Sequence, residues 1–586
     1  MDSRQNISLA TANGYYDQAL AVPQGVINSS FERLFGQYSD VMSRLDWDDD
    51  DGDISAELYP SQLLIPGDVG MNLSKIYHLI RFKSGQIRNR NGLLQKKVDN
   101  WVVAVACDLD AQFIKRKPDD KETPSEKRHR EFIEKEFDIP GDYRIERLYA
   151  KLSSANWNNF DMEHSKFFND DGKEITFDEW EDEDEREAAR FQSFCNSWAR
   201  SMERRGLTTL GLKITLPDDV PTQQSTFTPV AMLHQIYPYH DAAGNVETGF
   251  TPNGNANCLL YLEKVKGGDI TEAKLPDAKQ LGFSGNFSFP DGGGGGTPSG
   301  TFVVSQQLVL QHFLLPQLQG INEASSIYAG PVYGDAGGWG YPTEWGFDPD
   351  YPDSSRSVYE FKPSPDGKSY TYHKECTTPD EPHFGTVWMR TEHWSKANTT
   401  LTWEPRGTKM KLVGNCEYCR AVRISGSASM SDPEDTFSRE YYTASWSISI
   451  GMQLNDGALE FAIIPGDDPE NPWNMTATAE SDQSDNLKTG GINEKKFPKI
   501  ITATISKRIE TVRENLAAGL QQSGKFVYTG TGQLNFSNAM FTENGSVVAD
   551  VTWKTIQGGG RIIIKPPQPL QRFTSLQGIG DKIGLH

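Results

Sequence analysis

Histidine is the side chain best suited to acid–base chemistry near neutral pH, and three of the ten histidines deserve a test. His312 lies within an apolar helical segment, where a histidine is more often a satisfied core residue than a base. His234 and His240 lie on either side of Tyr237 and Tyr239, after a predicted strand, where they could line a cleft. The sequence has no Gly-x-Ser-x-Gly elbow, no His-Glu-x-x-His and no Walker or dinucleotide glycine pattern. It therefore predicts no catalytic residue, and the three histidines are the first to mutate if the chain is an enzyme.

Cys416 and Cys419 have the spacing of a metal knuckle. A zinc ribbon needs a second pair, and His373 with Cys376 lies too far upstream to be a good substitute. In a strand, residues three positions apart point to opposite faces of the sheet, so the two thiols do not converge. We interpret both as structural thiols and expect no metal and no cofactor.

Two acidic segments resemble calcium-binding loops. In residues 167–179 the first and twelfth ligand positions are Phe167 and the short Asp178, so two main ligands are wrong. In residues 46–57 the glycine required at the sixth position is Asp51. We interpret both segments as solvated acidic loops.

Composition narrows the class of partner and the compartment. Lys and Arg total 58 against 80 Asp and Glu among 586 residues, a net charge of −22, so we expect no nucleic-acid partner. Hydrophobic residues make up 37% of the chain, too many for a disordered one. The sequence starts without a signal-peptide pattern and has no apolar run long enough for a transmembrane segment, and its six cysteines are too sparse for a disulfide scaffold. We expect a soluble cytoplasmic protein, with release by a route that needs no signal peptide left open.

Five segments carry a helical period of apolar residues. The apolar residues of the fourth segment run almost all round, so we expect it to be buried and Pro316 to kink or end it. The segments are residues 31–45, 124–137, 191–205, 305–320 and 498–522.

Between the helical segments the apolar residues alternate with polar ones. This period of two, seen in residues 101–109, 210–216, 399–403 and 444–454, is typical of strands with one buried face and one polar face. Strands outnumber helices. The sequence therefore predicts an α+β protein in which long curved antiparallel sheets wrap around long amphipathic helices.

The order of these elements repeats after a glycine-rich break, which predicts two similar halves. The N-terminal half is residues 1–290, with an acidic insertion at about 118–190. Residues 291–300 form a flexible linker, residues 301–565 the C-terminal half and residues 566–586 a tail.

The combination of long helices and alternating strands resembles the tubular lipid-binding (TULIP) superfamily. The residues that carry the likeness are Phe302 to Pro316, the helix Ile505 to Leu520, and the strands within Phe526 to Asn538 and Phe541 to Trp553. Within the superfamily, these segments are most similar to the accessory proteins encoded beside clostridial toxin genes. The resemblance implies a curved antiparallel sheet around a long helix, with an apolar groove for a lipid. The acidic insertion and an aromatic loop at residues 333–351 depart from the family pattern and put membrane docking in doubt.

When the apolar stripe of a helix faces the apolar side of a curved sheet, the side chains either fill a core or line a tubular cavity. The same residues would do so in both cases. Our main hypothesis is a non-enzymatic protein that binds a lipid or another hydrophobic small molecule. The alternatives are a cavity enzyme, such as a cyclase or isomerase acting on a hydrophobic natural-product intermediate, and an accessory protein that binds a protein partner in a toxin or other complex. From periodicity, the predicted lining residues are Leu310, Phe313, Leu314, Trp446, Ile505, Ile509, Val512 and Leu516.

Overall fold

The computed structural model gives the fold of most of the chain. It describes residues 3–12, 14–37, 39–50, 52–67, 75–114, 144–155, 160–204, 208–215, 228–266, 281–290, 300–326, 359–380, 383–384, 387–426, 436–455, 458–483, 496–517, 524–528 and 532–553. The predicted helix at 124–137, the glycine-rich linker, the aromatic loop at 333–351 and the tail all lie outside these residues.

The chain forms two compact units that interleave in sequence. Unit 1 comprises Met1–Ser8, Val304–Gln521 and Asn538–Val548, and unit 2 comprises Leu9–Val303, Gln522–Ser537 and Ala549–His586. Neither unit is a continuous stretch. The division into two similar halves at residues 1–290 and 301–565 stays a prediction.

The main sheet of unit 2 is mostly antiparallel and has the order β14-β15-β3-β16-β27-β26-β25-β13-β10-β9-β7-β5-β4, with β6 and β8 beside β7. Two small hairpins, β1–β2 and β11–β12, accompany it. The strands are β1 (Ala10–Thr11), β2 (Gly14–Tyr15), β3 (Gln18–Pro23), β4 (Arg44–Asp49), β5 (Gly52–Leu58), β6 (Gln62–Leu64), β7 (Lys75–Asn89), β8 (Leu94–Lys97), β9 (Val102–Ile114), β10 (Arg144–Lys151), β11 (Phe167–Phe168), β12 (Glu174–Ile175), β13 (Thr209–Thr215), β14 (Thr228–Tyr237), β15 (Cys258–Lys266), β16 (Gly300–Val304), β25 (Gly524–Tyr528), β26 (Gly532–Phe541) and β27 (Val547–Trp553).

Short helices and one long helix complete unit 2. Helix α5 packs its aromatic face on β7 and the start of β9, where Phe191 lies 5.6 Å from Phe82 and 5.4 Å from Trp101 between ring centroids. The helices are α1 (Gln24–Gln37), α2 (Ser39–Met42), the 3-10 turn η2 (Leu152–Ser154), α4 (Phe177–Glu183), α5 (Glu185–Arg204) and α6 (Pro252–Asn255).

Unit 1 is built on one sheet of very long strands, in the order β17-β18-β20-β21-β22-β23, with β19 beside β20 and β24 beside β22. All of its described pairings are antiparallel. The strands are β17 (Lys362–Pro363), β18 (Ser369–Asp380), β19 (His383–Phe384), β20 (Val387–Trp403), β21 (Lys409–Gly426), β22 (Thr436–Asn455), β23 (Ala458–Ile464) and β24 (Thr476–Gln483).

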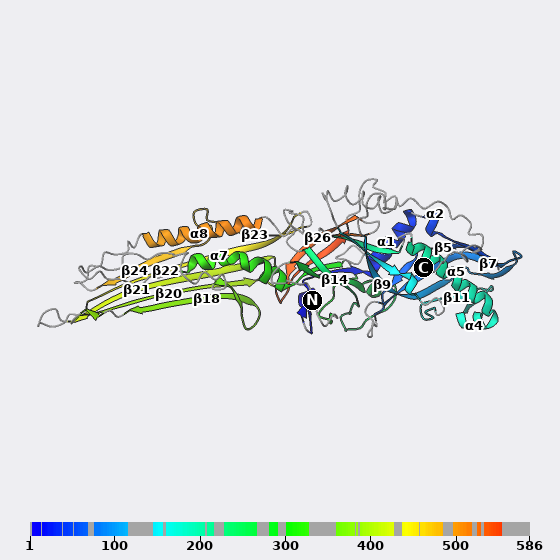
Figure 1. The fold of residues 1–586 in the computed structure, drawn as a ribbon, viewed down its shortest axis with the longest axis horizontal. Coiled ribbons are helices and arrows are strands. Elements are labelled where there is room, and N and C mark those ends of the chain that lie inside the picture. The colour runs from blue at the N-terminus through cyan, green and yellow to red at the C-terminus, as the bar shows by residue number, and fades with distance from the viewer. Residues whose placement is uncertain are drawn as a thin grey trace, which may run out of the picture. The chain divides into compact units, whose positions relative to one another are not determined.

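Two helical rods lie along the unit 1 sheet, α8 over β22, β23 and β24 and α7 against β20 (Figure 1). They also contact each other, so they cover the same face of the sheet. The helices of unit 1 are the 3-10 turn η1 (Ser3–Asn6), the π-helical segment η3 (Gln307–Leu314), α7 (Leu315–Ser325) and α8 (Lys496–Ala517).

The mixed α+β class and the largely antiparallel sheets are confirmed, but long amphipathic helices are not a general feature of the fold. Among the described helices only α5 and α8 reach 20 residues, and α2, α4 and α6 have four to seven. No helix in the described part of the chain is both long and apolar enough to span a membrane. The similarity of the two halves stays a prediction.

Three local predictions need correction. The helix predicted at 31–45 starts earlier, at Gln24 directly after β3, and residues 44–49 form β4 instead. The acidic loop predicted at 46–57 is largely the hairpin β4–β5, because Trp47 pairs with Ile54 and Leu45 with Ala56 in register. Pro316 does not end its helix, and the kink stays a prediction. The π-helical segment precedes it, and Pro316 stands in the first turn of α7, where the missing N–H is tolerated.

Candidate functional site

The strongest candidate site is the layer between the unit 1 sheet and its two helical rods, which we call the inner layer. Alternation along β22 places Ala444, Trp446, Ile448 and Ile450 on the inner face, where all four are buried. The serines and threonines between them are only half-buried on the other face. The period of two in the sequence therefore reports a sheet with one apolar and one polar face, as predicted.

Helix α8 supplies one side of the inner layer. Ile501, Ile505, Ile509, Val512 and Leu516 recur at steps of three and four, and each is buried. Residues on the opposite side of the helix are largely exposed. Burial of this stripe on the sheet stabilises the helix through the hydrophobic effect rather than through its intrinsic propensity.

Segments η3 and α7 supply the rest of the cover. Leu308, Leu310, Leu314, Leu318 and Ile321 are buried along them. Phe313 is half-buried, and its ring lies 6.3 Å from that of Phe461 on β23, between centroids. Helix α7 and helix α8 approach closely because Gly320 has no side chain.

The α7–α8 contact is closed by an ion pair over that glycine. A Cβ at Gly320 would lie 2.9 Å from Cδ of Arg508. Arg508 Nη2 in turn lies 2.9 Å from Oε2 of Glu323 on α7. Both side chains are about two-fifths exposed, so the pair orients the helices more than it stabilises them.

The eight predicted lining residues all belong to unit 1. Seven of them are buried in the inner layer, and Phe313 is half-buried at its edge. They come from η3, α8 and β22, which are far apart in the sequence. That these residues line a bound ligand stays a prediction.

A few polar side chains link the helices to the sheet. Gln311 Nε2 donates to the hydroxyl of Tyr370 at 2.9 Å, and the hydroxyls of Ser326 and Tyr372 lie 2.8 Å apart. Burial raises the pKa of Tyr372 to about 12, so the phenol stays neutral and keeps its proton for this hydrogen bond.

Three polar atoms of the inner layer have no hydrogen-bond partner among the described residues. They are Oδ1 of Asn322, Oγ1 of Thr399 and Nε1 of Trp446. Each side chain is at most 1% exposed. Buried polar groups without a partner are rare in native proteins and cost free energy of folding. These three atoms are therefore candidates for contact with a ligand or an ordered water molecule.

Sequence reasoning missed most of the polar members of this layer. Tyr370 and Tyr372 alternate with threonine at the start of β18, a signal that is readable in the sequence. Thr399 is in phase with Leu401 and Trp403, so the alternation at residues 399–403 does place it on the buried face. Asn322 lies among other polar residues of α7, such as Gln319 and Glu323, and no local signal marks it as buried.

The three histidines proposed for catalysis do not form a group. His312 belongs to unit 1, whereas His234 and His240 belong to unit 2. His234 lies on β14 with its ring 5.1 Å from that of Tyr261, and His240 lies beyond the strand with its ring 3.8 Å from that of Phe283. Aromatic packing accounts for both positions without a catalytic role.

The two cysteines of the knuckle-like pair point to opposite faces of β21, as expected. Cys416 pairs in register with Ala397 and Ala444 on the inner face, whereas Cys419 is flanked by Trp394 and Tyr441 on the other. Burial raises the pKa of the Cys416 thiol to about 12. The thiol is therefore protonated at neutral pH, and a thiolate metal ligand is disfavoured.

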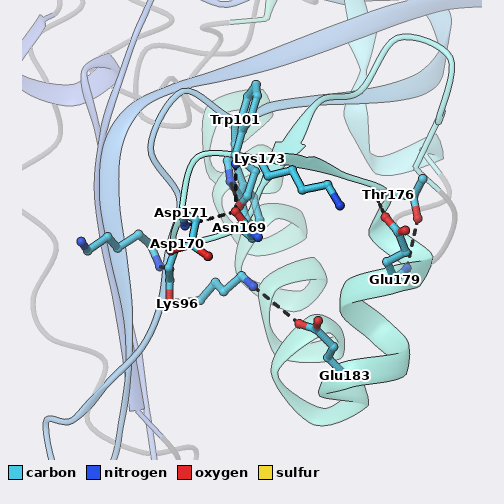
Figure 2. A network of polar contacts seen from close by, with 11 residues as sticks. Lys96, Trp101, Asn169, Asp170, Asp171, Lys173, Thr176, Glu179 and Glu183 are labelled. Atoms are coloured by element: carbon cyan, nitrogen blue, oxygen red, sulfur yellow. Dashed lines mark hydrogen bonds and ion pairs between the residues drawn. The ribbon is translucent and has the colours of Figure 1, made fainter.

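The acidic segment at 167–179 is a tight polar network in unit 2 (Figure 2). Asn169 Oδ1 accepts from the backbone N–H groups of Asp171 and Lys173, so it closes the β11–β12 turn itself. Thr176 and Glu179 then form a reciprocal capping box at the start of α4. The polar atoms of these side chains are engaged in hydrogen bonds with backbone N–H groups. No group of metal-binding side chains is found in the described residues.

Comparisons with known proteins give structural similarity alone. No protein-family model and no curated protein sequence matches the chain. Among solved structures, P47 from Clostridium botulinum A2 matches with a TM-score of 0.40 and 10% identity, over 92% of this chain and 97% of that one. P47 of C. botulinum E1 gives 0.38 at 10% identity, over 92% and 99%. A lipopolysaccharide binding protein gives 0.31 at 10% identity, over 93% and 100%. Similarity at this level does not identify a shared function.

Proposed function

We propose that unit 1 binds a lipid or another hydrophobic small molecule in its inner layer, without chemical conversion. The observation that supports this best is the nature of the contact between the sheet and its two rods. Each side presents buried apolar side chains, from β22 on one side and from η3 and α8 on the other. Apolar contacts are not directional, so an apolar ligand can replace those between β22 and α8, away from the hydrogen bonds that link Gln311 and Ser326 to β18.

The half-buried Phe313 marks the place where such a ligand would first meet the layer. It lies between fully buried residues of η3 and the ring of Phe461, and part of its surface is in solvent. Entry beside Phe313 requires movement of one side chain before any strand pairing is disturbed. Membership of the TULIP superfamily, which would imply the same kind of ligand, stays a prediction.

No observation favours the two alternative functions. A cavity enzyme needs at least one acid–base group in the apolar layer, and of the three candidate histidines only His312, which is half-buried on η3, belongs to unit 1. An accessory protein of a toxin complex needs a partner surface, for which the described residues give no specific evidence.

The test is native mass spectrometry of the purified full chain with organic extraction, followed by titration with the uncharged dye Nile red. We expect a stoichiometric hydrophobic compound or saturable Nile red binding. Phe313→Ala should weaken dye binding roughly tenfold, the effect of losing about 1.4 kcal/mol of apolar contact. Val413→Ala is the matched control, because Val413 is 43% exposed on the outer face of β21.

A chain that carries no hydrophobic compound and takes up no dye would exclude the proposed function. Equal weakening by Phe313→Ala and Val413→Ala would place any binding outside the inner layer.

A further inference from the structure

Two of the three unpartnered polar atoms of the inner layer, those of Thr399 and Trp446, belong to a single row of the sheet. Thr399 on β20 pairs in register with Gly414 on β21, and Gly414 pairs with Trp446 on β22. Thr399 and Trp446 are therefore two strands apart on the same face, with a residue that has no side chain between them.

The indole of Trp446 lies across that gap. A Cβ at Gly414 would stand 2.1 Å from Cζ2 of Trp446 and 2.6 Å from its Nε1. The N–H group of Trp446 is thus placed above the middle strand, towards the strand that carries Thr399. We call Thr399, Gly414 and Trp446 the polar row.

Asn322 lies on α7 and is linked through Ser326 to β18, the strand next to β20. The Ser326 hydroxyl donates to the backbone oxygen of Asn322 at 2.8 Å and also bonds the Tyr372 hydroxyl at 2.8 Å. Tyr372 is the register partner of Thr399. Asn322 Nδ2 donates to the backbone oxygen of Tyr359 at 2.9 Å, which holds the amide and leaves Oδ1 as an unused acceptor.

The unused groups define the chemistry of what they can bind. Trp446 offers a donor, Asn322 an acceptor, and Thr399 a hydroxyl that can act as either. A group that both donates and accepts satisfies all three. An anionic head group would leave Asn322 Oδ1 without a donor, and no Lys or Arg side chain is buried among the described residues of unit 1 to compensate its charge. An ammonium group would leave the Trp446 N–H without an acceptor.

We propose that Asn322, Thr399 and Trp446 bind the uncharged hydroxyl end of an amphiphile whose hydrocarbon part lies in the inner layer. This inference rests on the proposed function and narrows it to neutral hydroxylated lipids or metabolites. Satisfying the three atoms at once removes the cost that the unliganded layer carries.

The test compares decan-1-ol, 1-methoxynonane and undecane, which have equal numbers of non-hydrogen atoms, as competitors of Nile red on the full chain. In a purely apolar layer their affinities follow their partition between water and hexadecane. We expect the ether, which accepts from Trp446 and Thr399, to exceed that reference by roughly 25-fold, and the alcohol, which also donates to Asn322, by roughly 125-fold, about fivefold for each hydrogen bond.

Three variants assign the groups. Trp446→Phe should lower the excess affinity of the ether, which can only accept, about fivefold, and Asn322→Leu should abolish the further gain of the alcohol, which can also donate. Thr399→Val should reduce the excess of both. Thr400→Val, on the opposite face of the same strand, is the matched control and should change nothing.

The outcomes separate the two proposals. Affinities of the wild-type chain that follow the hexadecane reference would overturn the polar row as an anchor, by showing that it binds only water, while leaving the proposed function intact. This comparison needs no variant, so it holds even if a substitution prevents folding. Absence of binding by all three compounds and by Nile red would exclude the proposed function itself.

Discussion

Trp101 in unit 2 and Trp446 in unit 1 are both fully buried, yet their surroundings differ in kind. The indole N–H of Trp101 donates to the backbone oxygen of Phe168 at 2.9 Å, and its ring meets Phe167, Trp180 and Phe191 edge-on. Among the described residues the N–H of Trp446 has no partner, and its ring lies over a glycine. One site is complete as a core. The other keeps hydrogen-bonding capacity unused, which is the property expected of a binding site rather than of a core.

The largest expected effect comes from giving both tryptophans the same substitution. Trp101→Phe should lower the free energy of unfolding of unit 2 by about 4 kcal/mol, because it leaves a cavity and also the Phe168 oxygen without its donor. Trp446→Phe should cost about 1–2 kcal/mol, because the lost N–H had no partner. Hydrogen exchange measured by mass spectrometry reports each unit separately. Equal losses of protection in the two units would remove the distinction between the two sites.

The second prediction is that unit 2 loses stability at low pH because of one buried histidine. His78 on β7 is buried with both ring nitrogens unpartnered, and burial lowers its pKa to about 4. The unfolded chain takes up the proton near pH 6.5 and the folded chain only near pH 4, so stability should fall as the pH drops between these values. The total loss is about 3 kcal/mol.

The His78→Leu variant checks this directly. It should keep unit 2 equally protected from exchange at pH 6.5 and pH 4.5, after correction for the intrinsic exchange rate, whereas the wild type should lose protection at the lower pH. An unchanged pH dependence in the variant would assign the loss to other groups.

The prediction with the smallest expected effect tests whether the indole of Trp446 lies over Gly414. Gly414→Ala should lower the free energy of unfolding of unit 1 by about 2 kcal/mol, because the added Cβ displaces the indole. Gly451→Ala is the matched control on β22, since its Cβ meets only the flexible end of Ile464 at 2.6 Å. Combining Gly414→Ala with Trp446→Leu should recover most of the loss. Equal stability of the two alanine variants would show that Trp446 does not lie over Gly414.

Periodicity predicted the elements of the inner layer well. The alternation of Ala444 to Leu454 lies within β22, and the stripe from Ile505 to Leu516 lies within α8, because both patterns follow from burial of one face. The interior position of the predicted lining residues follows from the same rule. Ligand binding does not follow, since the apolar pattern is the same for a filled and for a lined layer.

What the sequence did not reveal depends on contacts between distant residues. Gln24, Asn28 and Asn257 are buried amides that bond the backbone around Leu63 and Ile65, and each reads as an ordinary surface residue in sequence. The polar row is of the same kind, because it exists only when β20, β21 and β22 are in register. The hairpin β4–β5 was missed because its four aspartates conceal an alternation of only two apolar residues on β4 and three on β5.

The interleaving of the units constrains how the protein is made in the cell. Unit 1 needs Met1–Ser8 and Asn538–Val548, and unit 2 needs strands that end at Trp553. Synthesis adds roughly 5–20 residues per second, so neither unit is complete until roughly half a minute to two minutes after Met1 has been added. The apolar face of β22 is synthesised before α8, which covers it, and α8 is synthesised before the last strands. The nascent chain is therefore expected to depend on chaperones that bind exposed apolar strands during synthesis.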